Sequence, residues 1–290
     1  MICLQVPATT ANLGTGFDCL GLALSLYNRY DVELCDQDLL ENVEDRFDRP
    51  DNLFLKAYHK GCEEIGANDC IHAVFHCDIP VSRGLGSSAS LIAGGLYAAS
   101  VLHDNALDKS RIFTLAAQME HHPDNVAPAV FGGLTACLDM KTMRSLPLAD
   151  DWHFTVLIPD FEVSTEDARK ILPSSYSAKD TYSAVARAVM TLQALEHGDI
   201  PLLQSACKDV LHEPYRKALI HDYDILHDMV VHDTSGVFLI SGSGSTCLLI
   251  SRNELSDSVV GKISTRTNPS WTMLSLAPDM KGAQALKRAE

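Results

Sequence analysis

Polar and hydrophobic residues alternate along much of the first eighty positions, a pattern typical of β-strands. It predicts strands over residues 1–8, 19–27, 29–35 and 70–80. The polar stretch 36–52 predicts a loop or an edge strand. Residues 53–66 instead place apolar side chains near a helical repeat, and Gly66 is a typical helix stop.

Helical spacing dominates the next segment. Residues 91–102 are apolar and rich in small side chains, which predicts a buried helix. Residues 108–122 repeat their apolar side chains at helical spacing and predict a second helix. Residues 122–133 predict a loop, because Pro123, Pro128 and a Gly-Gly pair interrupt them.

A shift in composition over residues 140–152 marks a candidate boundary between two domains, 1–150 and 151–290. Beyond it, strands are predicted over residues 153–159, 236–241, 246–251 and, as the last strand, 271–278. Helices are predicted over residues 164–173, capped by Ser164 or Thr165, and over residues 179–198, ending at Gly198. This mixture of strands and helices predicts an α+β fold.

Composition narrows the class of protein. The 290 residues are 46% hydrophobic and 21% charged, as in a globular protein with a large core. No apolar run is long enough to span a membrane, and the first residues lack the pattern of a secretory signal. Nine dispersed cysteines, none in a C-x-x-C pair, indicate reduced thiols in the cytoplasm. The net charge of −15 argues against nucleic acid or an anionic membrane as a partner.

One stretch, PVSRGLGSSAS (residues 80–90), has the composition of a phosphate-binding loop. It is not a P-loop, because no lysine follows its glycines. Gly84, Gly86 and Ala89 match G-x-G-x-x-A, but Asp104, the candidate ribose ligand, lies between two predicted helices instead of at the end of a strand. What remains is a helix N-terminus with glycines and hydroxyls. Spacing alone supports a phosphate site and a plain helix cap equally.

Three separated stretches resemble the three motifs of the GHMP kinases, a superfamily of small-molecule kinases. They are residues 7–24, 80–90 and 241–249. Within this superfamily, VPATTANLGTGFD, EHHPDNVAPAVFGGL, STEDARKILP and HEPYR are most similar to the homoserine kinases. The resemblance runs from end to end of the chain. It implies an N-terminal domain of the ribosomal-S5 type, a C-terminal ferredoxin-like domain, and a substrate site between them.

The same resemblance implies ATP and Mg²⁺ as cofactors. Ser88 and Glu120 match the residues that hold Mg²⁺, an ion that prefers oxygen ligands. Asn52 matches a position near the adenine. The positions matching those that bind the phosphates are Pro80, Arg83, Gly84, Leu85, Gly86, Ser87, Ser88 and Ala89.

The resemblance also implies a set of substrate-binding residues, namely Asn12, Asp18, Asn125, Thr165, Arg169 and Arg216. Asp18 suits an ammonium group, and the arginines suit a carboxylate through paired N–H donors. By the same resemblance, Arg169 neutralises charge on the transferred phosphoryl group, and Asn125 and Asp124 orient the attacking hydroxyl. Asp124 is the nearby candidate for a general base, a role that the resemblance leaves open.

These matches predict phosphorylation of the side-chain hydroxyl of L-homoserine to O-phospho-L-homoserine, in threonine biosynthesis, by a homodimer. Two alternatives stay open. One is a GHMP kinase for a mevalonate-type hydroxy acid, which would leave Asp18 without an ammonium partner. The other is a catalytically silent relative that binds a small molecule. Three positions depart from the family pattern: Thr15 and Ser245, where proline is common, and His121, where glycine is usual.

Overall fold

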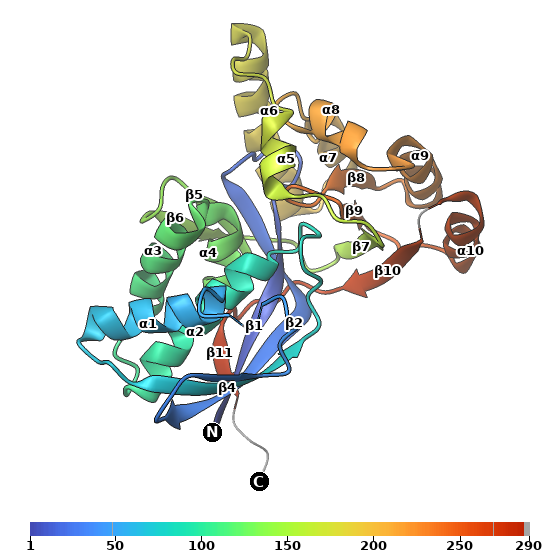
Figure 1. Ribbon diagram of the computed structural model, residues 1–290. Coiled ribbons are helices and arrows are strands. Elements are labelled where there is room, and N and C mark those ends of the chain that lie inside the picture. The colour runs from blue at the N-terminus through green and yellow to red at the C-terminus, as the bar shows by residue number, and fades with distance from the viewer. Residues whose placement is uncertain (48, 269, 287–290) are drawn as a thin grey trace.

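Two sheets organise the chain, one of seven strands and one of four among residues 1–47, 49–268 and 270–286, which the computed structural model describes (Figure 1). The first sheet has the order β11-β1-β2-β4-β3, with β5 paired to β2 and β6 to β5. Neighbouring strands are antiparallel except β3 and β4. The strands are β1 (Ile2–Ala11), β2 (Leu20–Cys35), β3 (Leu39–Glu41), β4 (Cys70–Cys77), β5 (Leu134–Cys137), β6 (Met143–Leu146) and β11 (Gln284–Leu286).

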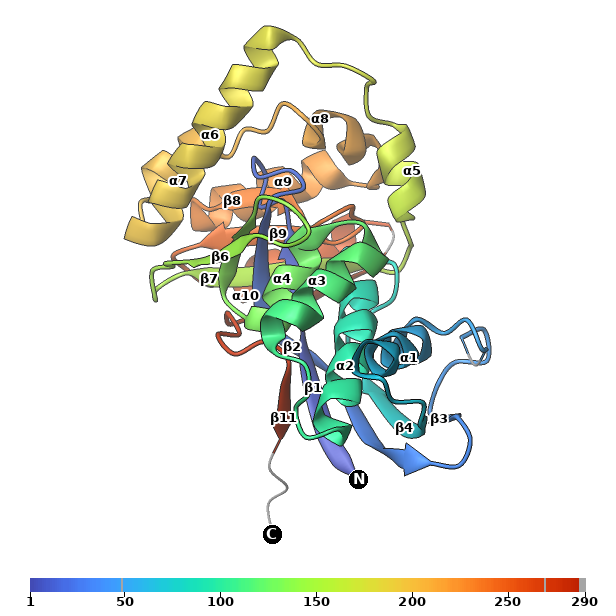
Figure 2. The same cartoon turned by 90° about the vertical axis from the view of Figure 1, so that its left-hand side faces the viewer.

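Four helices cover one face of this sheet (Figures 1 and 2). They are α1 (Leu53–Ile65), α2 (Ser87–Leu102), α3 (Lys109–Glu120) and α4 (Pro123–Phe131). In the core between helices and sheet, the rings of Tyr30, Phe54 and Phe75 contact one another with centroids 4.7–5.1 Å apart. α1 and α2 meet at Gly95, where a Cβ atom would lie only 2.2 Å from the carbonyl oxygen of Phe54.

The second sheet has the order β10-β7-β9-β8, and its strands are β7 (His153–Pro159), β8 (Val237–Ile240), β9 (Cys247–Ser251) and β10 (Trp271–Leu276). With its helices it follows the β-α-β-β-α-β sequence of ferredoxin-like folds. Between β7 and β8 lie α5 (Thr165–Lys170), α6 (Ala178–His197), α7 (Ile200–Ala206), α8 (Glu213–Arg216), a 3₁₀ turn (Lys217–Leu219) and α9 (Tyr223–Thr234). α10 (Asp257–Arg266) joins β9 to β10.

Apolar side chains from both sheets share one core. Leu22 and Leu134 reach it from the first sheet, Val156 and Leu248 from the second, and Leu195 from α6. The two sheets are therefore packed together through this core. Among the described residues, no helix combines the length and apolar character needed to cross a membrane.

Residues 122–133 were expected to be a loop, and that prediction was wrong, because they contain helix α4. Pro123 occupies the first position of α4, where a helix needs no N–H donor. Pro128 lies inside the helix and removes one donor, to the carbonyl of Asp124. That carbonyl lies against Gly21 on β2, which leaves it room because glycine has no side chain.

The last strand is β11 and not β10, which corrects a second prediction. β11 returns to the first sheet and pairs with β1. The chain passes from one sheet to the other between β6 and β7, near the expected boundary at residue 150. By sequence β11 belongs to the segment 151–290, but it pairs with a strand of the segment 1–150. The division into domains 1–150 and 151–290 stays a prediction.

Replacing Gly95 by Ala is expected to lower the free energy of unfolding by about 2 kcal/mol, because the new methyl group would overlap the backbone of α1. Gly261, inside α10, is the matched control, since nothing lies within 4 Å of its Cβ position. Gly261→Ala is expected to raise that free energy by about 0.5–1 kcal/mol. Urea denaturation followed by circular dichroism measures both, and equal effects would contradict the close packing of α1 on α2.

Candidate active site

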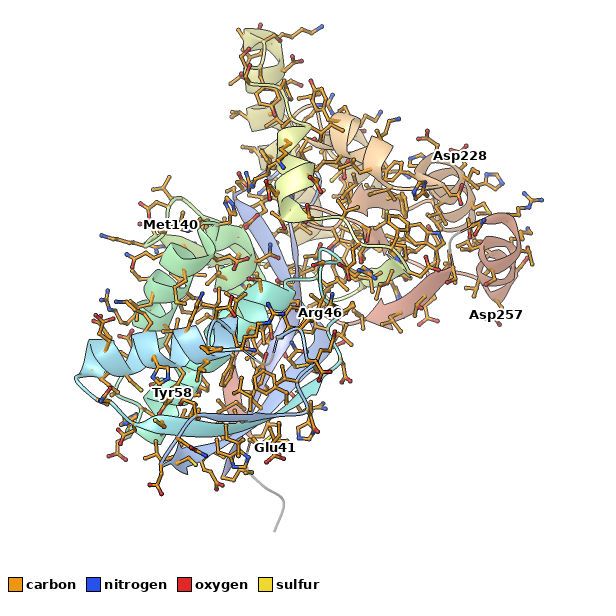
Figure 3. All side chains as sticks on the ribbon, in the orientation of Figure 1. Glu41, Arg46, Tyr58, Met140, Asp228 and Asp257 are labelled. Carbon is orange, nitrogen blue, oxygen red and sulfur yellow. The ribbon has the colours of Figure 1, made fainter. Side chains whose placement is uncertain are left out.

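A cavity of about 530 Å³ lies between the two halves of the chain, a size usual for small-molecule sites. Its wall is formed mainly by the loop of residues 42–47 and 49–52, by residues at the start of α2, and by Gly242 and Ser243 in the turn between β8 and β9. Arg46, in the loop, lies near the middle of the molecule, between α2 and the second sheet (Figure 3). The cavity therefore collects residues from motifs far apart in the sequence.

The glycines of the second motif bring its backbone against neighbouring strands. Gly84 has a φ of +72°, and a Cβ atom there would lie 2.2 Å from the carbonyl oxygen of Ser241. Gly86 is the N-cap of α2 and has a φ of +69°, and a Cβ atom there would lie even closer to the side chain of Thr9 on β1. No side chain caps this end of α2. The N–H groups of the first turn are therefore available to a ligand, and the helix dipole favours an anion.

Of the other residues predicted to bind the phosphates, some line the cavity and others do not. Ser87 and Ser88 lie on the cavity wall, in the first turn of α2. Leu85 and Ala89 are fully buried in hydrophobic cores, and Pro80 lies outside the wall. The side chains of Leu85 and Ala89 therefore support the loop from behind instead of facing the cavity.

Arg83 ties the second motif to the second sheet. Its Nε and Nη2 donate to the carbonyl oxygens of Pro159 and Asp160, at 3.1 and 3.3 Å. Its Nη1 lies 3.2 Å from a carboxylate oxygen of Glu162. The side chain lines the cavity, but its charge is already paired.

The loop of residues 42–47 and 49–52 forms one side of the cavity, which the sequence pattern did not indicate. It brings Arg46 and Arg49 to the wall. Asn52, expected near the adenine, also lines the cavity, but its side chain caps α1 by accepting the backbone N–H of Phe54 at 2.9 Å. Two arginines within an acidic stretch are the signal that could have indicated an anion-binding loop here.

Ser88 and Glu120, the two residues predicted to hold Mg²⁺, lie next to each other on the cavity wall. The hydroxyl of Ser88 donates to Glu120 Oε2 at 2.5 Å. Burial raises the pKa of Glu120, and this hydrogen bond opposes the rise. No group of three or more His, Cys, Asp or Glu side chains among the described residues could hold a metal. One carboxylate and one hydroxyl nevertheless suit Mg²⁺, which uses few protein ligands beside water and phosphate oxygens.

Two neighbouring residues at the start of α4 face different surroundings. Asn125 lines the cavity, and its side-chain oxygen accepts a hydrogen bond from Thr9 at 2.8 Å. Asp124 is only 3% exposed and accepts the backbone N–H of Asn125 at 3.0 Å. Burial, with the added repulsion of Asp18, raises the pKa of Asp124 to about 7. This carboxyl group therefore changes its charge near neutral pH.

A bidentate ion pair joins the first motif to α5. Arg169 donates to both carboxylate oxygens of Asp18, at 2.8 and 3.2 Å. The side chain of Asn12 holds this loop by accepting the backbone N–H of Asp18 at 3.0 Å. Nη2 of Arg169 also lies 3.2 Å from His122 Nδ1, and its Nε is buried without a hydrogen-bond partner among the described residues. Thr165, one turn earlier on α5, lines the cavity, so this helix connects the cavity with the ion pair.

Arg216 is buried close to this pair. It is 2% exposed, and its Nε and Nη1 donate to the carbonyl oxygens of Ala168 and Gly242, both at 3.0 Å. Its guanidinium lies 5.1 Å from the centre of the Phe17 ring. Within the described part of the chain no carboxylate pairs with it, and burial, with repulsion from Arg169, lowers its pKa. A buried cation without a counter-ion is costly, so this position favours the approach of an anion.

Gly242 is the point at which the cavity and the charged residues adjoin. It belongs to the cavity wall, and its carbonyl oxygen accepts hydrogen bonds from Asn12 at 2.8 Å and from Arg216 at 3.0 Å. The structure thus brings the substrate residues expected from the first motif, from α5 and from α8 next to the glycine loop.

His212 connects the loop of the first motif to Arg216, a role that the sequence pattern did not indicate. It is fully buried, and its Nε2 lies 2.7 Å from the carbonyl oxygen of Gly14, to which it donates. Its Nδ1 faces Arg216 at 3.5 Å, and its ring stacks on Phe17 with centroids 5.0 Å apart. Burial lowers the pKa of His212, which favours the neutral ring. Its position in HEPYR, one helical turn before Arg216, is the signal that could have identified it.

At each of the three positions that depart from the family pattern, the structure shows a specific contact or backbone conformation. The Thr15 hydroxyl lies 2.9 Å from that of Thr191 on α6. The Ser245 hydroxyl donates to the carbonyl oxygen of Phe161 at 2.7 Å. His121 is exposed and ends α3 with a φ of +66°, a left-handed conformation that accounts for the glycine usual there.

Comparison with known proteins agrees with this geometry. The model of the GHMP kinases N terminal domain matches residues 52–133. A homoserine kinase of Clostridium botulinum (strain 657 / Type Ba4) is 41% identical over 263 residues, covering 89% of this chain and 88% of the relative. Another, from Caldicellulosiruptor saccharolyticus, is 38% identical over 297 residues, covering 98% and 96%. The chain belongs to the homoserine kinase family.

The fold agrees with this membership. The crystal structure of homoserine kinase from Cytophaga hutchinsonii matches with a TM-score of 0.87 at 24% identity, covering 98% of this chain and 97% of that one. The GHMP kinase fold and the α+β class are therefore confirmed. Membership of the family makes the chain a kinase of the GHMP type, and it favours the homoserine kinase prediction over a mevalonate-type kinase.

Asp124→Asn is expected to change how stability depends on pH. The folded-state pKa of Asp124, about 7, exceeds the ordinary value of 3.8, so the folded wild type binds more protons than the unfolded chain between these values. Its stability therefore falls as pH rises through this window, whereas the variant lacks this loss. The free energy of unfolding of the variant, minus that of the wild type, is expected to be about 4 kcal/mol larger at pH 8 than at pH 4. Urea denaturation at both pH values measures this difference, and a pH-independent one would contradict the account.

Proposed function

We propose that this protein transfers the terminal phosphoryl group of ATP to the side-chain hydroxyl of L-homoserine, producing O-phospho-L-homoserine and ADP. The observation that carries the proposal is the cluster of Asp18, Arg169 and Arg216 beside the cavity of the glycine loop. One carboxylate and two guanidinium groups suit an amino acid, which offers an ammonium and a carboxylate. The names of the homoserine kinases among its relatives support the same substrate.

The cavity is the proposed ATP site. The uncapped N-terminus of α2 and the hydroxyl of Ser87 would bind the phosphates, because N–H donors and the helix dipole converge there. Arg46 and Arg49 add positive charge to the opposite wall. The loop of residues 42–47 and 49–52 would then enclose the nucleoside, with Asn52 fixing the shape of the loop through its cap on α1.

Ser88 and Glu120 would hold Mg²⁺, since both oxygens face the cavity and already lie within hydrogen-bond distance. When bound, the ion would neutralise charge on the phosphate oxygens. The pKa of Glu120 is raised by burial, so a cation beside it would also favour the ionised carboxylate. This pair supports a kinase over a silent binding protein, because a simple binder has no use for such a site next to a glycine loop.

The charged cluster would orient homoserine. In the proposal Asp18 receives the ammonium group, while Arg216 and Arg169 receive the carboxylate. Asp18 and Arg169 are each about one third exposed, at 37% and 34% of their side chains, so a ligand can reach their ion pair. With Arg216, the substrate would extend this pair into a network of five charges. A mevalonate-type acid lacks the ammonium and would leave Asp18 facing a second carboxylate.

The hydroxyl of the substrate would lie near Asn125, which faces the cavity from the start of α4. Phosphoryl transfer depends mainly on alignment and on neutralising charge, so Asn125 and Asp124 are proposed to position the hydroxyl and Arg169 to stabilise the transferred group. A reaction of this kind belongs to threonine biosynthesis. None of the nine cysteines forms a disulfide within the described part of the chain, which supports a reducing compartment such as the cytoplasm.

The direct experiment is a measurement of ADP release from ATP and Mg²⁺ with L-homoserine, L-serine, L-threonine and mevalonate, with phosphorus NMR to identify the product. The proposal predicts a kcat/KM for L-homoserine at least about 100-fold above the others. Preference for mevalonate would overturn the assignment of the charged cluster. Measurable ATP binding without turnover of any of the four would instead favour the silent relative.

Arg216→Gln is expected to raise the KM for L-homoserine about 100-fold, because a charge-assisted contact to the carboxylate is lost. His212→Gln acts through Arg216 and Gly14, so we expect a rise in the same KM of about tenfold. In both variants the KM for ATP should stay within about twofold, since neither residue lines the cavity.

Arg187→Gln is the matched control for these variants. Arg187, on α6, also donates to backbone carbonyls, those of Ser205 and Ala206, but it forms no contact with the charged cluster among the described residues. Its replacement should leave both KM values unchanged. A rise in the KM for ATP in Arg216→Gln, without one for L-homoserine, would contradict the proposed role of Arg216.

A further inference from the structure

Two cysteines lie opposite each other at one end of the first sheet, and the proposed reaction does not use them. Cys35 is the last residue of β2, Cys70 is the first residue of β4, and the antiparallel register pairs them directly. Opposite residues of two antiparallel strands have Cα atoms about 4.5–5.5 Å apart, and a disulfide spans about 4.4–6.8 Å between Cα atoms. The backbone therefore already holds the two thiols at a separation that a disulfide can bridge.

Both cysteines belong to the face of the sheet that lies opposite the helices. Side chains alternate along a strand, and Val32 on β2 and Ile71 on β4 are fully buried in the core beneath the helices. Cys35 comes three residues after Val32, and Cys70 comes one residue before Ile71, so both are on the other face. Cys35 is exposed and Cys70 is partly exposed, and neither forms a disulfide. A small molecule can therefore reach this pair from solvent.

The turn that follows β2 is fastened to the start of β4. The chain crosses from β2 to β3 past this end of β4, which lies between them, and Asp38 accepts the backbone N–H of Ile71 at 3.0 Å. Figure 3 shows Glu41, on β3, at the lower edge of the molecule, away from Arg46 at the cavity. A disulfide at this end would close a covalent ring around the segment 36–69, which carries the cavity loop and α1.

A second pair of cysteines is close together but protected by burial. The backbone N–H of Cys137, the last residue of β5, donates to the carbonyl oxygen of Cys19, just before β2, at 2.9 Å. Cys137 is 6% exposed, and burial raises the pKa of its thiol to about 12. Burial also raises the pKa of the Cys19 thiol. Because the thiolate is the form that attacks a disulfide, this pair reacts slowly, and exposure distinguishes Cys35 and Cys70 from it.

Acidic residues surround the exposed pair. Five carboxylates lie next to it in sequence or on the adjoining strand, namely Glu33, Asp36, Asp38, Glu41 and Asp69. The N-terminus and three histidines pair with four of them and offset part of the charge. Asp36 forms no ion pair within the described part of the chain. The surroundings therefore keep a negative charge, which favours a small disulfide with ammonium groups over one with carboxylates.

We propose that Cys35 and Cys70 form a thiol–disulfide exchange site for small cationic disulfides such as cystamine. The thiolate of Cys35, the more exposed residue, attacks one sulfur of the small disulfide, which gives a mixed disulfide and releases one small thiolate. The thiolate of Cys70 then attacks Sγ of Cys35 and expels the second small thiolate. The protein dithiol loses two protons and two electrons, and the small disulfide becomes two thiols. An excess of small thiols drives the same steps backwards.

Peptide mass spectrometry of the whole chain tests the site, after exposure to cystamine and alkylation of the remaining thiols in denaturant. We expect one internal disulfide, between Cys35 and Cys70, while Cys19 and Cys137 are alkylated. Cys70→Ser lacks the second step, so the mixed disulfide at Cys35 should accumulate at least about tenfold above its level in the wild type. A wild type that keeps this mixed disulfide, links Cys70 to another cysteine, oxidises Cys19 and Cys137 first or does not react would overturn the proposal.

A comparison with dithiodiglycolate, which carries carboxylates where cystamine carries ammonium groups, tests the preference for cations. The ratio of the two rate constants, cystamine over dithiodiglycolate, should fall at least about threefold between about 0.01 M and about 1 M salt, because salt screens the carboxylates. Asp36→Asn should lower this ratio about twofold at low salt. Asp228→Asn, on α9 in the other half of the chain, is the matched control and should leave it unchanged (Figure 3). A ratio that does not depend on salt would overturn this preference.

Discussion

The ion pair between Asp18 and Arg169 is the contact on which the candidate site depends, because it joins a loop of the first sheet to a helix of the second half. A partly exposed pair of this kind adds only about 0–1 kcal/mol to stability. Its importance is that it fixes the positions of the loop and the helix that it joins. It fixes α5, which carries Thr165 to the cavity wall. It also holds the loop of the first motif, where Asn12 reaches the carbonyl oxygen of Gly242.

Around this pair the structure concentrates positive charge inside an acidic protein. Arg216 is buried without a counter-ion among the described residues, and such a group costs stability unless a ligand balances it. The start of α2 is a second place that favours an anion. Gly242 borders both, so the proposed sites for a carboxylate and for phosphates lie next to each other. This juxtaposition is what a kinase acting on a small zwitterion requires.

The parts of the fold that depend on residues close together in the sequence were largely predictable. Gly66 and Gly198 end α1 and α6 as expected, because helix caps depend on nearby residues. Helix α4 was not predicted, because Pro123 at its first position resembles a loop signal. Strand β11 was not predicted, because it pairs with β1, which lies at the other end of the sequence. The motif residues were found in the sequence, but their pairing with one another, and the role of buried His212, depend on tertiary packing that spacing does not reveal.

The most direct test of the account compares L-homoserine with 4-hydroxybutyrate, which has the same hydroxyl and carboxylate but no ammonium group. The measurement is the ratio of kcat/KM for the two substrates in the wild type and in Asp18→Asn. If Asp18 receives the ammonium group, the wild type prefers L-homoserine by about 100-fold or more, and the variant loses most of this preference. An unchanged ratio in Asp18→Asn would contradict the central claim that this charged cluster selects an amino-acid substrate.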